Sequence, residues 1–102
     1  MIRMLVTSLL VTTLSACTFV HMAPKAANVK VLATAPNCEK RGEAEVSVRH
    51  KVGFYERSEA QVRDELETLA RNEAPGVGAD SISPLGPPVE GGQSWALWRC
   101  GR

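Results

Sequence analysis

A regular alternation of apolar and polar residues predicts the first two strands of this chain. In the segment VKVLAT, residues 29–34, the side chains alternate with a period of two, and Pro36 with Asn37 ends the pattern. The segment 44–52 places alanine, valine and histidine on one face and charged or hydroxyl side chains on the other. A period of two is typical of a half-buried β-strand. We therefore expect strands over 29–34 and 44–52, with a turn at EKRG, residues 39–42, before the second.

The apolar period changes to that of a helix after Ser58. Ser58 and Gln61 have the spacing of a capping box, and Pro75 followed by glycine ends the helical pattern. We therefore expect a helix over about 59–74, with its charged residues on a solvated face. The apolar stripe of this helix consists of Val62, Leu66, Leu69, Ala70 and Ala74.

Two more strands are predicted after the helix, over 80–84 and 94–100, with the glycine- and proline-rich segment 85–93 between them. Trp95 and Trp98 fall on opposite faces of the last strand. Because one helix covers one side of a small sheet, at least one of the two rings should be partly exposed. Either tryptophan, or the 85–93 segment, is a candidate contact with a partner protein.

These elements predict an α+β fold. We expect a small sheet of about four strands in the order β-β-α-β-β, with one helix packed on one face of the sheet. The contacts of the helix with the sheet should run through Val62, Leu66 and Leu69.

The first 16 residues have the composition of a secretory signal peptide, with a basic Arg3 followed by an apolar run from Met4 to Leu14. This run is too short for a membrane anchor, which needs about 20 apolar residues. LSAC, residues 14–17, resembles the lipobox of bacterial lipoproteins, in which the cysteine receives a diacylglycerol and the chain is cut just before it. The alternative is an ordinary signal peptide that is cut near Ala23 and discarded with Cys17.

The lipobox divides the chain into a removed signal peptide (1–16), a flexible tether (17–28) and a single domain (29–102). Several acyl chains on Cys17, palmitate among them, would make the membrane attachment effectively permanent. Because Thr18 follows the cysteine where inner-membrane lipoproteins carry aspartate, we expect attachment to the outer membrane, on its periplasmic face.

Length and charge narrow the class of protein further. The chain has 102 residues, enough for one small domain, and 12 Lys and Arg against 11 Asp and Glu, with no long run of one sign. Such a balance gives no support for nucleic-acid binding. The sequence also lacks the glycine-rich motifs of nucleotide-binding sites, and we expect no cofactor.

With Cys17 used for lipid, the chain retains Cys38 and Cys100. In an oxidising compartment such a pair is expected to form a disulfide. The competing interpretation is a pair of metal ligands completed by His21 or His50. This spacing matches no common metal-binding pattern, so we expect no metal site.

The order of these features resembles a family of small proteobacterial outer-membrane lipoproteins of unknown function, distantly similar to the envelope-stress lipoprotein RcsF. The resemblance covers nearly the whole domain and implies an α/β domain with an internal disulfide on an outer-membrane anchor. It implies no catalytic residue. The residues that carry it are Cys17, Cys38 with Gly42, Arg71-Asn72, Gly78-Ala79-Asp80 and Cys100.

The function expected from the sequence is that of a non-enzymatic protein-interaction or stress-sensing module, bound to the membrane through Cys17 and to an unknown envelope protein. The alternative is a small periplasmic ligand-binding or hydrolytic domain that uses His50 with a carboxylate such as Glu45 or Glu56. A purely structural envelope component is the third interpretation. A histidine at the end of a strand is more often a partly buried residue than a catalytic base.

Overall fold

The computed structural model describes residues 21–52 and 55–101. The expected signal peptide and the expected lipobox with Cys17 lie outside the described residues. Among the helices within those ranges, none has the length and apolar character needed to cross a membrane.

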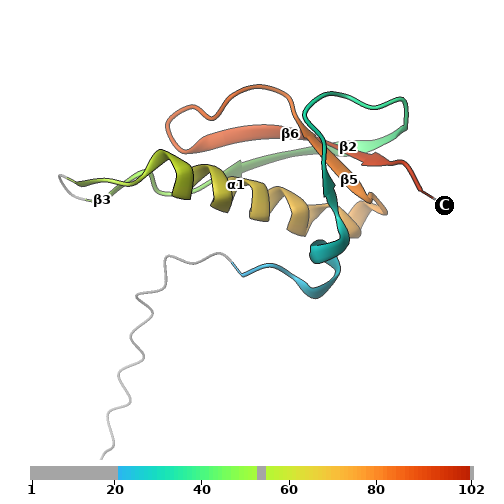
Figure 1. Cartoon of the computed structure of the whole chain (residues 1–102), viewed down its shortest axis with the longest axis horizontal. Coiled ribbons are helices and arrows are strands. Elements are labelled where there is room, and N and C mark those ends of the chain that lie inside the picture. Colours follow the sequence, from blue (N-terminus) through green and yellow to red (C-terminus); the bar gives the residue numbers. More distant parts are fainter. Residues whose placement is uncertain (1–20, 53–54, 102) are drawn as a thin grey trace, which may run out of the picture.

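The fold is α+β, as expected, and is built on a mixed four-stranded sheet with the strand order β1-β5-β6-β2 (Figure 1). Strand β6 runs antiparallel to both of its neighbours, whereas β1 pairs with β5 in parallel. The order β-β-α-β-β is confirmed for this sheet. The strands are β1 (Lys30–Val31), β2 (Glu39–Ser47), β5 (Ser81–Pro84) and β6 (Gly92–Arg99).

Strand β2 begins and ends earlier than the alternation predicts. The expected turn over residues 39–42 is wrong, because Glu39 to Gly42 already pair with β6, with a register shift between Lys40 and Gly42. After Ser47 the chain leaves the sheet and forms a separate hairpin of β3 (Lys51–Val52) and β4 (Tyr55–Glu56). The single strand predicted over 44–52 is therefore two strands in two sheets.

Helix α1 (Glu59–Glu73) packs on one face of the main sheet and carries the apolar stripe that the sequence predicts. The Ser58 hydroxyl accepts a long hydrogen bond of 3.5 Å from the Gln61 amide, as expected for the helix cap. Val62 and Leu66 are buried, whereas Leu69 is half-buried at the margin of the core. The sheet side of this core includes Val46, Ile82, Trp95 and Leu97.

The opposite face of the sheet is also covered in part. Ser81, Ser83 and Ala96 are at most 1% exposed and lie outside the helix-side core. The segment between β1 and β2 runs over this face (Figure 1). Trp98 is half-buried there and donates its indole N–H to the Ser83 hydroxyl at 2.8 Å. The domain thus buries residues on both faces of its sheet, although it has one α-helix among the described residues.

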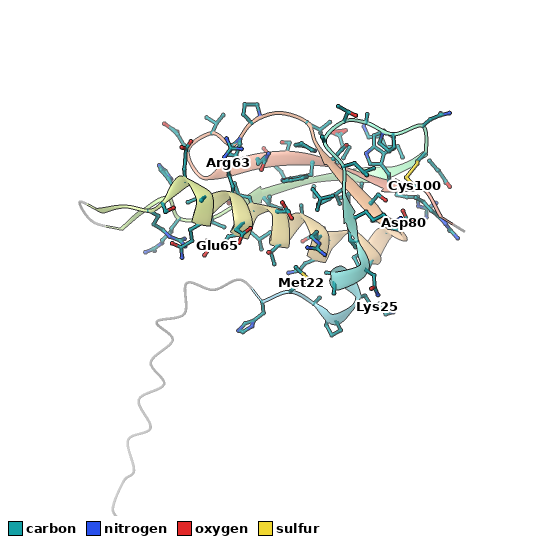
Figure 2. All side chains as sticks on the ribbon, viewed as in Figure 1. Met22, Lys25, Arg63, Glu65, Asp80 and Cys100 are labelled. Carbon is teal, nitrogen blue, oxygen red and sulfur yellow. A yellow bond between two sulfur atoms is a disulfide. The ribbon has the colours of Figure 1, made fainter. Side chains whose placement is uncertain are left out.

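The disulfide between Cys38 and Cys100 is confirmed (Figure 2). The two Cα atoms are 4.9 Å apart, within the range that a disulfide can bridge. Because both sulfurs are used in this bond, the alternative of a metal site built on the two cysteines is wrong. The bond joins the start of β2 to the end of β6, two strands that are neighbours in the sheet.

The flexible tether expected over 17–28 is not observed in its described part. Pro24–Asn28 form a 3₁₀ helix, η1, in which Ala26 is fully buried. Two side chains of α1 hold this segment through hydrogen bonds. Asn72 forms hydrogen bonds with the backbone of residues 21 and 23, and Arg71 donates hydrogen bonds to the carbonyls of residues 26 and 27. Residues 21–28 are therefore part of the folded domain.

Candidate functional site

A groove of about 800 Å³ lies where the segment between β5 and β6 passes the ends of β2 and β6. One wall is apolar and is formed by Leu85, Pro87 and Val89. The other side carries carboxylate, hydroxyl and amide groups from the two strands. This polar lining consists of Glu45, Ser47, Gln93 and Ser94.

Hydrogen bonds of the backbone, rather than packing of its side chains in the core, hold the segment that carries the apolar wall in place. The Leu85 amide donates to Ser94 at 2.9 Å, and Val89 and Gly92 exchange two hydrogen bonds of 2.8 and 2.9 Å. The Gln93 side chain donates to the carbonyl of Gly86 at 2.9 Å. Leu85 and Val89 nevertheless remain 50% and 67% exposed. The segment therefore presents two apolar side chains to solvent from a fixed backbone.

The candidate tryptophans lie away from this groove. Trp95 is 4% exposed and belongs to the core beneath α1, so it offers little ring surface to a partner. Its indole N–H is buried without a hydrogen-bond partner among the described residues. Trp98, on the other face, is half-buried. The expectation of one partly exposed ring is met by Trp98, while the interaction role of either ring stays a prediction.

His50 lines a second cavity of about 460 Å³, between the start of α1 and the segment that leads into β6. Two carboxylate residues, Glu59 and Glu90, line it as well, but no hydrogen bond or ion pair joins them to His50 among the described residues. Glu45, the expected partner of His50, lines the groove described above instead. The side chain of Glu56 lies outside the described part of the chain.

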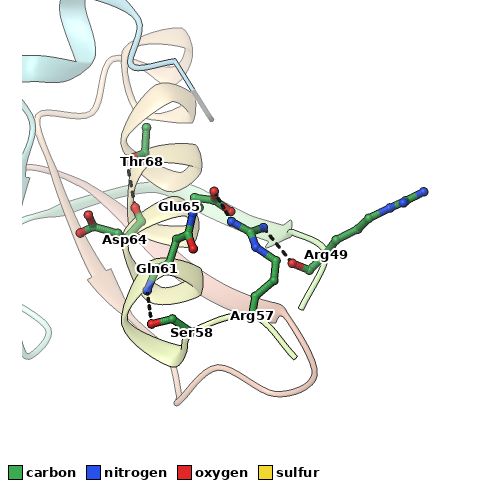
Figure 3. A network of polar contacts seen from close by, with 7 residues as sticks. All are labelled: Arg49, Arg57, Ser58, Gln61, Asp64, Glu65 and Thr68. Carbon is green, nitrogen blue, oxygen red and sulfur yellow. Dashed lines mark hydrogen bonds and ion pairs between the residues drawn. The ribbon is translucent and has the colours of Figure 1, made fainter. Parts of the chain in front are cut away.

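An ion pair between Arg57 and Glu65 joins the hairpin region to α1 (Figure 3). The Arg57 guanidinium lies 2.6 Å from the Glu65 carboxylate and also donates to the Arg49 carbonyl at 2.9 Å. The two side chains are only 7% and 9% exposed. The hydrogen bond to Glu65 raises the pKa of Arg57. The prediction that the charged residues of the helix lie on a solvated face is therefore wrong at Glu65.

Asp80, which precedes β5, fixes the chain at the end of β6. Its carboxylate accepts hydrogen bonds from the backbone amides of Cys100 at 2.9 Å and Gly101 at 2.7 Å. It also accepts a hydrogen bond from the Ser81 hydroxyl at 2.9 Å. The hydrogen bond from Cys100, followed by that from Gly101, lowers the pKa of Asp80. Asp80 is labelled beside Cys100 in Figure 2. Its role was not predicted from local patterns, because both amides come from residues far along the chain.

We expect Asp80→Asn to destabilise the domain by about 1–2 kcal/mol at pH 7, because it weakens charge-assisted hydrogen bonds at a partly exposed site. A lowered pKa in the folded state favours folding above the unfolded pKa of about 3.9, and this contribution is lost as pH falls through the folded pKa. Urea unfolding from pH 7 to pH 2 should therefore show the variant and the parent protein converging below about pH 4. Asp64→Asn, at an exposed position of α1, is the control. Parallel curves for Asp80→Asn and the parent across this range would contradict the assigned role.

Metal-ligating residues do not gather elsewhere in the described ranges. No group of three or more histidine, cysteine, aspartate or glutamate side chains is placed to hold an ion there.

The fold and the groove together define a small disulfide-linked α+β domain with an exposed apolar wall. The chain belongs to the family described as Domain of unknown function (DUF4156), which it matches over residues 20–100. Comparisons with curated proteins and with solved structures gave no match. The family match carries no link to RcsF or to lipoproteins, so that part of the resemblance stays a prediction.

Proposed function

We propose that this protein is a lipid-anchored envelope protein whose domain binds another envelope protein through the groove beside Leu85 and Val89. The observation that carries the proposal is the apolar wall itself. Two aliphatic side chains, 50% and 67% exposed, stand on a hydrogen-bonded segment at the rim of a groove of about 800 Å³. Exposed apolar side chains that border a groove are typical of protein-interaction sites.

A fixed backbone favours binding because less chain must be ordered when a partner docks. The segment is already held by the bonds of Leu85, Val89 and Gln93, so association would restrict mainly side chains. The polar side of the groove supplies selectivity, because a partner that leaves these groups without hydrogen bonds is disfavoured. The Glu45 carboxylate favours a partner segment with a basic or hydrogen-bond-donating group at that position.

The proposed site is tested by photo-crosslinking in intact cells with a crosslinking residue at Val89, matched by one at Ala60 on the exposed side of α1. We expect a defined adduct with one envelope protein from position 89 and none from position 60. With that protein purified, Val89→Asp should weaken binding at least about tenfold, because a charge placed in an apolar contact must be desolvated. Ala60→Asp should leave the Kd unchanged. Equal affinity of the two variants, or the same adduct from both positions, would rule out the groove.

The proposed anchor is the lipid on Cys17, for which the support is the LSAC sequence at residues 14–17. We expect Cys17→Ser to remove the acyl mass from the mature protein and to shift the protein out of the outer-membrane fraction, because the thiol that accepts the lipid is absent. Mass spectrometry and membrane fractionation measure the two effects. Unchanged acylation and unchanged fractionation of this variant would exclude Cys17 as the anchor.

A further inference from the structure

The folded domain begins very close to the proposed lipid. The side-chain carbonyl of Asn72 accepts the amide of Ala23 at 2.8 Å, and its NH₂ group donates to the carbonyl of His21 at 2.8 Å. Arg71 donates to the carbonyls of Ala26 and Ala27 at 3.2 and 2.9 Å. These four bonds tie the chain to the end of α1 from residue 21 onward.

Only three residues separate Cys17 from His21 in the sequence. A fully extended chain covers at most about 3.3–3.6 Å per residue, so the distance from an acylated Cys17 to His21 is at most about 14 Å. By comparison, the 15 residues of α1 make a helix about 22 Å long. The connection is thus shorter than the domain's own helix, and the corner that contains η1 must stay near the lipid.

We infer that the domain rests on the phospholipid surface through this corner, with Met22 and Lys25 in contact with the headgroup region. The inference depends on the proposed acylation of Cys17. Met22 is 37% exposed, and Lys25 is exposed on η1 (Figure 2). A methionine can bury its side chain at the acyl boundary, while a lysine keeps its charge among lipid phosphates. A second cation, Arg99, lines the same shallow cavity as Lys25.

This orientation directs the groove away from the membrane. The η1 corner is bonded to Arg71 and Asn72 at the end of α1, whereas the segment from β5 into β6 lies beside the start of α1, toward the other end of the domain (Figure 1). With the η1 corner on the lipid, Leu85 and Val89 face the aqueous periplasm. The partner of the groove would then approach from the periplasm rather than from within the bilayer.

The experiment uses the acylated protein in vesicles of phosphatidylethanolamine and phosphatidylglycerol whose acyl chains carry bromine, a quencher of tryptophan fluorescence. Two variants place a further tryptophan at either end of the domain: Met22→Trp at the η1 corner and Val89→Trp at the groove. Both retain Trp95 and Trp98 as a common background. We expect the fluorescence of Met22→Trp to be quenched at least about twofold more than that of the parent, because residue 22 lies at the acyl boundary. Val89→Trp should be quenched no more than the parent.

The contribution of Lys25 is tested in the Met22→Trp protein. Lys25→Glu should reduce the quenching, because the charge that attracts anionic headgroups is reversed. Arg63→Glu, which makes the same charge change on the exposed side of α1, should not reduce it. Thermal unfolding of each variant verifies that the domain remains folded.

Mass spectrometry of the same samples separates the two proposals. If Cys17 carries no acyl chain, the proposed anchor fails and the membrane contact fails with it. If Cys17 is acylated but Met22→Trp is not quenched beyond the parent, only the orientation is overturned. Quenching of Val89→Trp as strong as that of Met22→Trp, or no effect of Lys25→Glu, would also overturn it.

Discussion

Reduction of the Cys38–Cys100 disulfide should lower the free energy of unfolding by about 4 kcal/mol, because the bond closes a loop of about 63 residues and restricts the unfolded chain. For a domain of this size such a loss corresponds to a fall in Tm of about 15–30 °C. The stability of a small domain is itself only several kcal/mol, so much of the reduced protein should be unfolded at growth temperature. Thermal melts with and without reductant measure the effect.

The two single variants provide the control for this prediction. Cys38→Ala and Cys100→Ala should be equally destabilising, and the double variant should be no worse than either, because each change removes the same covalent loop. Coincident melts in oxidising and reducing buffer would contradict the prediction. A wide difference between the single variants would show that local packing, rather than loop closure, dominates the loss.

Gly91→Ala should destabilise the domain by about 2–4 kcal/mol, because the site combines backbone strain with a steric clash. Gly91 has a φ of 77°, a conformation that favours glycine. A Cβ atom built on it would clash with the Val48 carbonyl oxygen and lie 3.0 Å from Nδ1 of His50. The Val48 amide also donates to the Gly91 carbonyl at 2.8 Å, so the backbone there cannot move away without losing this bond.

Gly42→Ala is the matched control for Gly91→Ala. A Cβ atom at residue 42 meets nothing within 4 Å, and the residue lies in the extended strand β2. We expect a change of no more than about 0.5 kcal/mol, since a surface substitution without strain has little effect. Urea unfolding of both variants measures the difference, and equal midpoints would contradict the assigned role of Gly91. Because Gly91 adjoins the segment that carries Val89, Gly91→Ala should also weaken partner binding.

The elements that were predicted correctly from the sequence depend mainly on local signals. The capping residue Ser58, the 3.6-residue stripe of α1 and the stop at Pro75 lie within one segment and are read without knowledge of the fold. The cysteine pairing was likewise predicted from cysteine count and compartment. In these cases local chemistry and the final fold favour the same structure.

The errors fall where distant segments decide the structure. EKRG has the composition of a turn, yet pairing with β6 holds Glu39 to Gly42 in an edge strand whose charged side chains remain in water. Residues 21–28 show no sustained period, but Arg71 and Asn72 of α1 supply their hydrogen bonds. Glu65 is buried because Arg57 folds back onto it. The groove depends on the same kind of contact, since β2 and the segment before β6 form it together.

The strand order of the main sheet has a consequence for how the chain folds during synthesis, which proceeds from the N-terminus. Strands β1 and β2 do not pair with each other; their partners are β5 and β6, which follow α1 in the sequence. When the chain emerges with its N-terminus first, β1 and β2 therefore have no partner in the main sheet until β5 and β6 have followed. The antiparallel pair β5 and β6 joins segments close in sequence, so it is the part of the sheet with the smallest loop-closure cost. Folding should accordingly start late and proceed backwards along the chain, with the N-terminal strand among the last elements to dock.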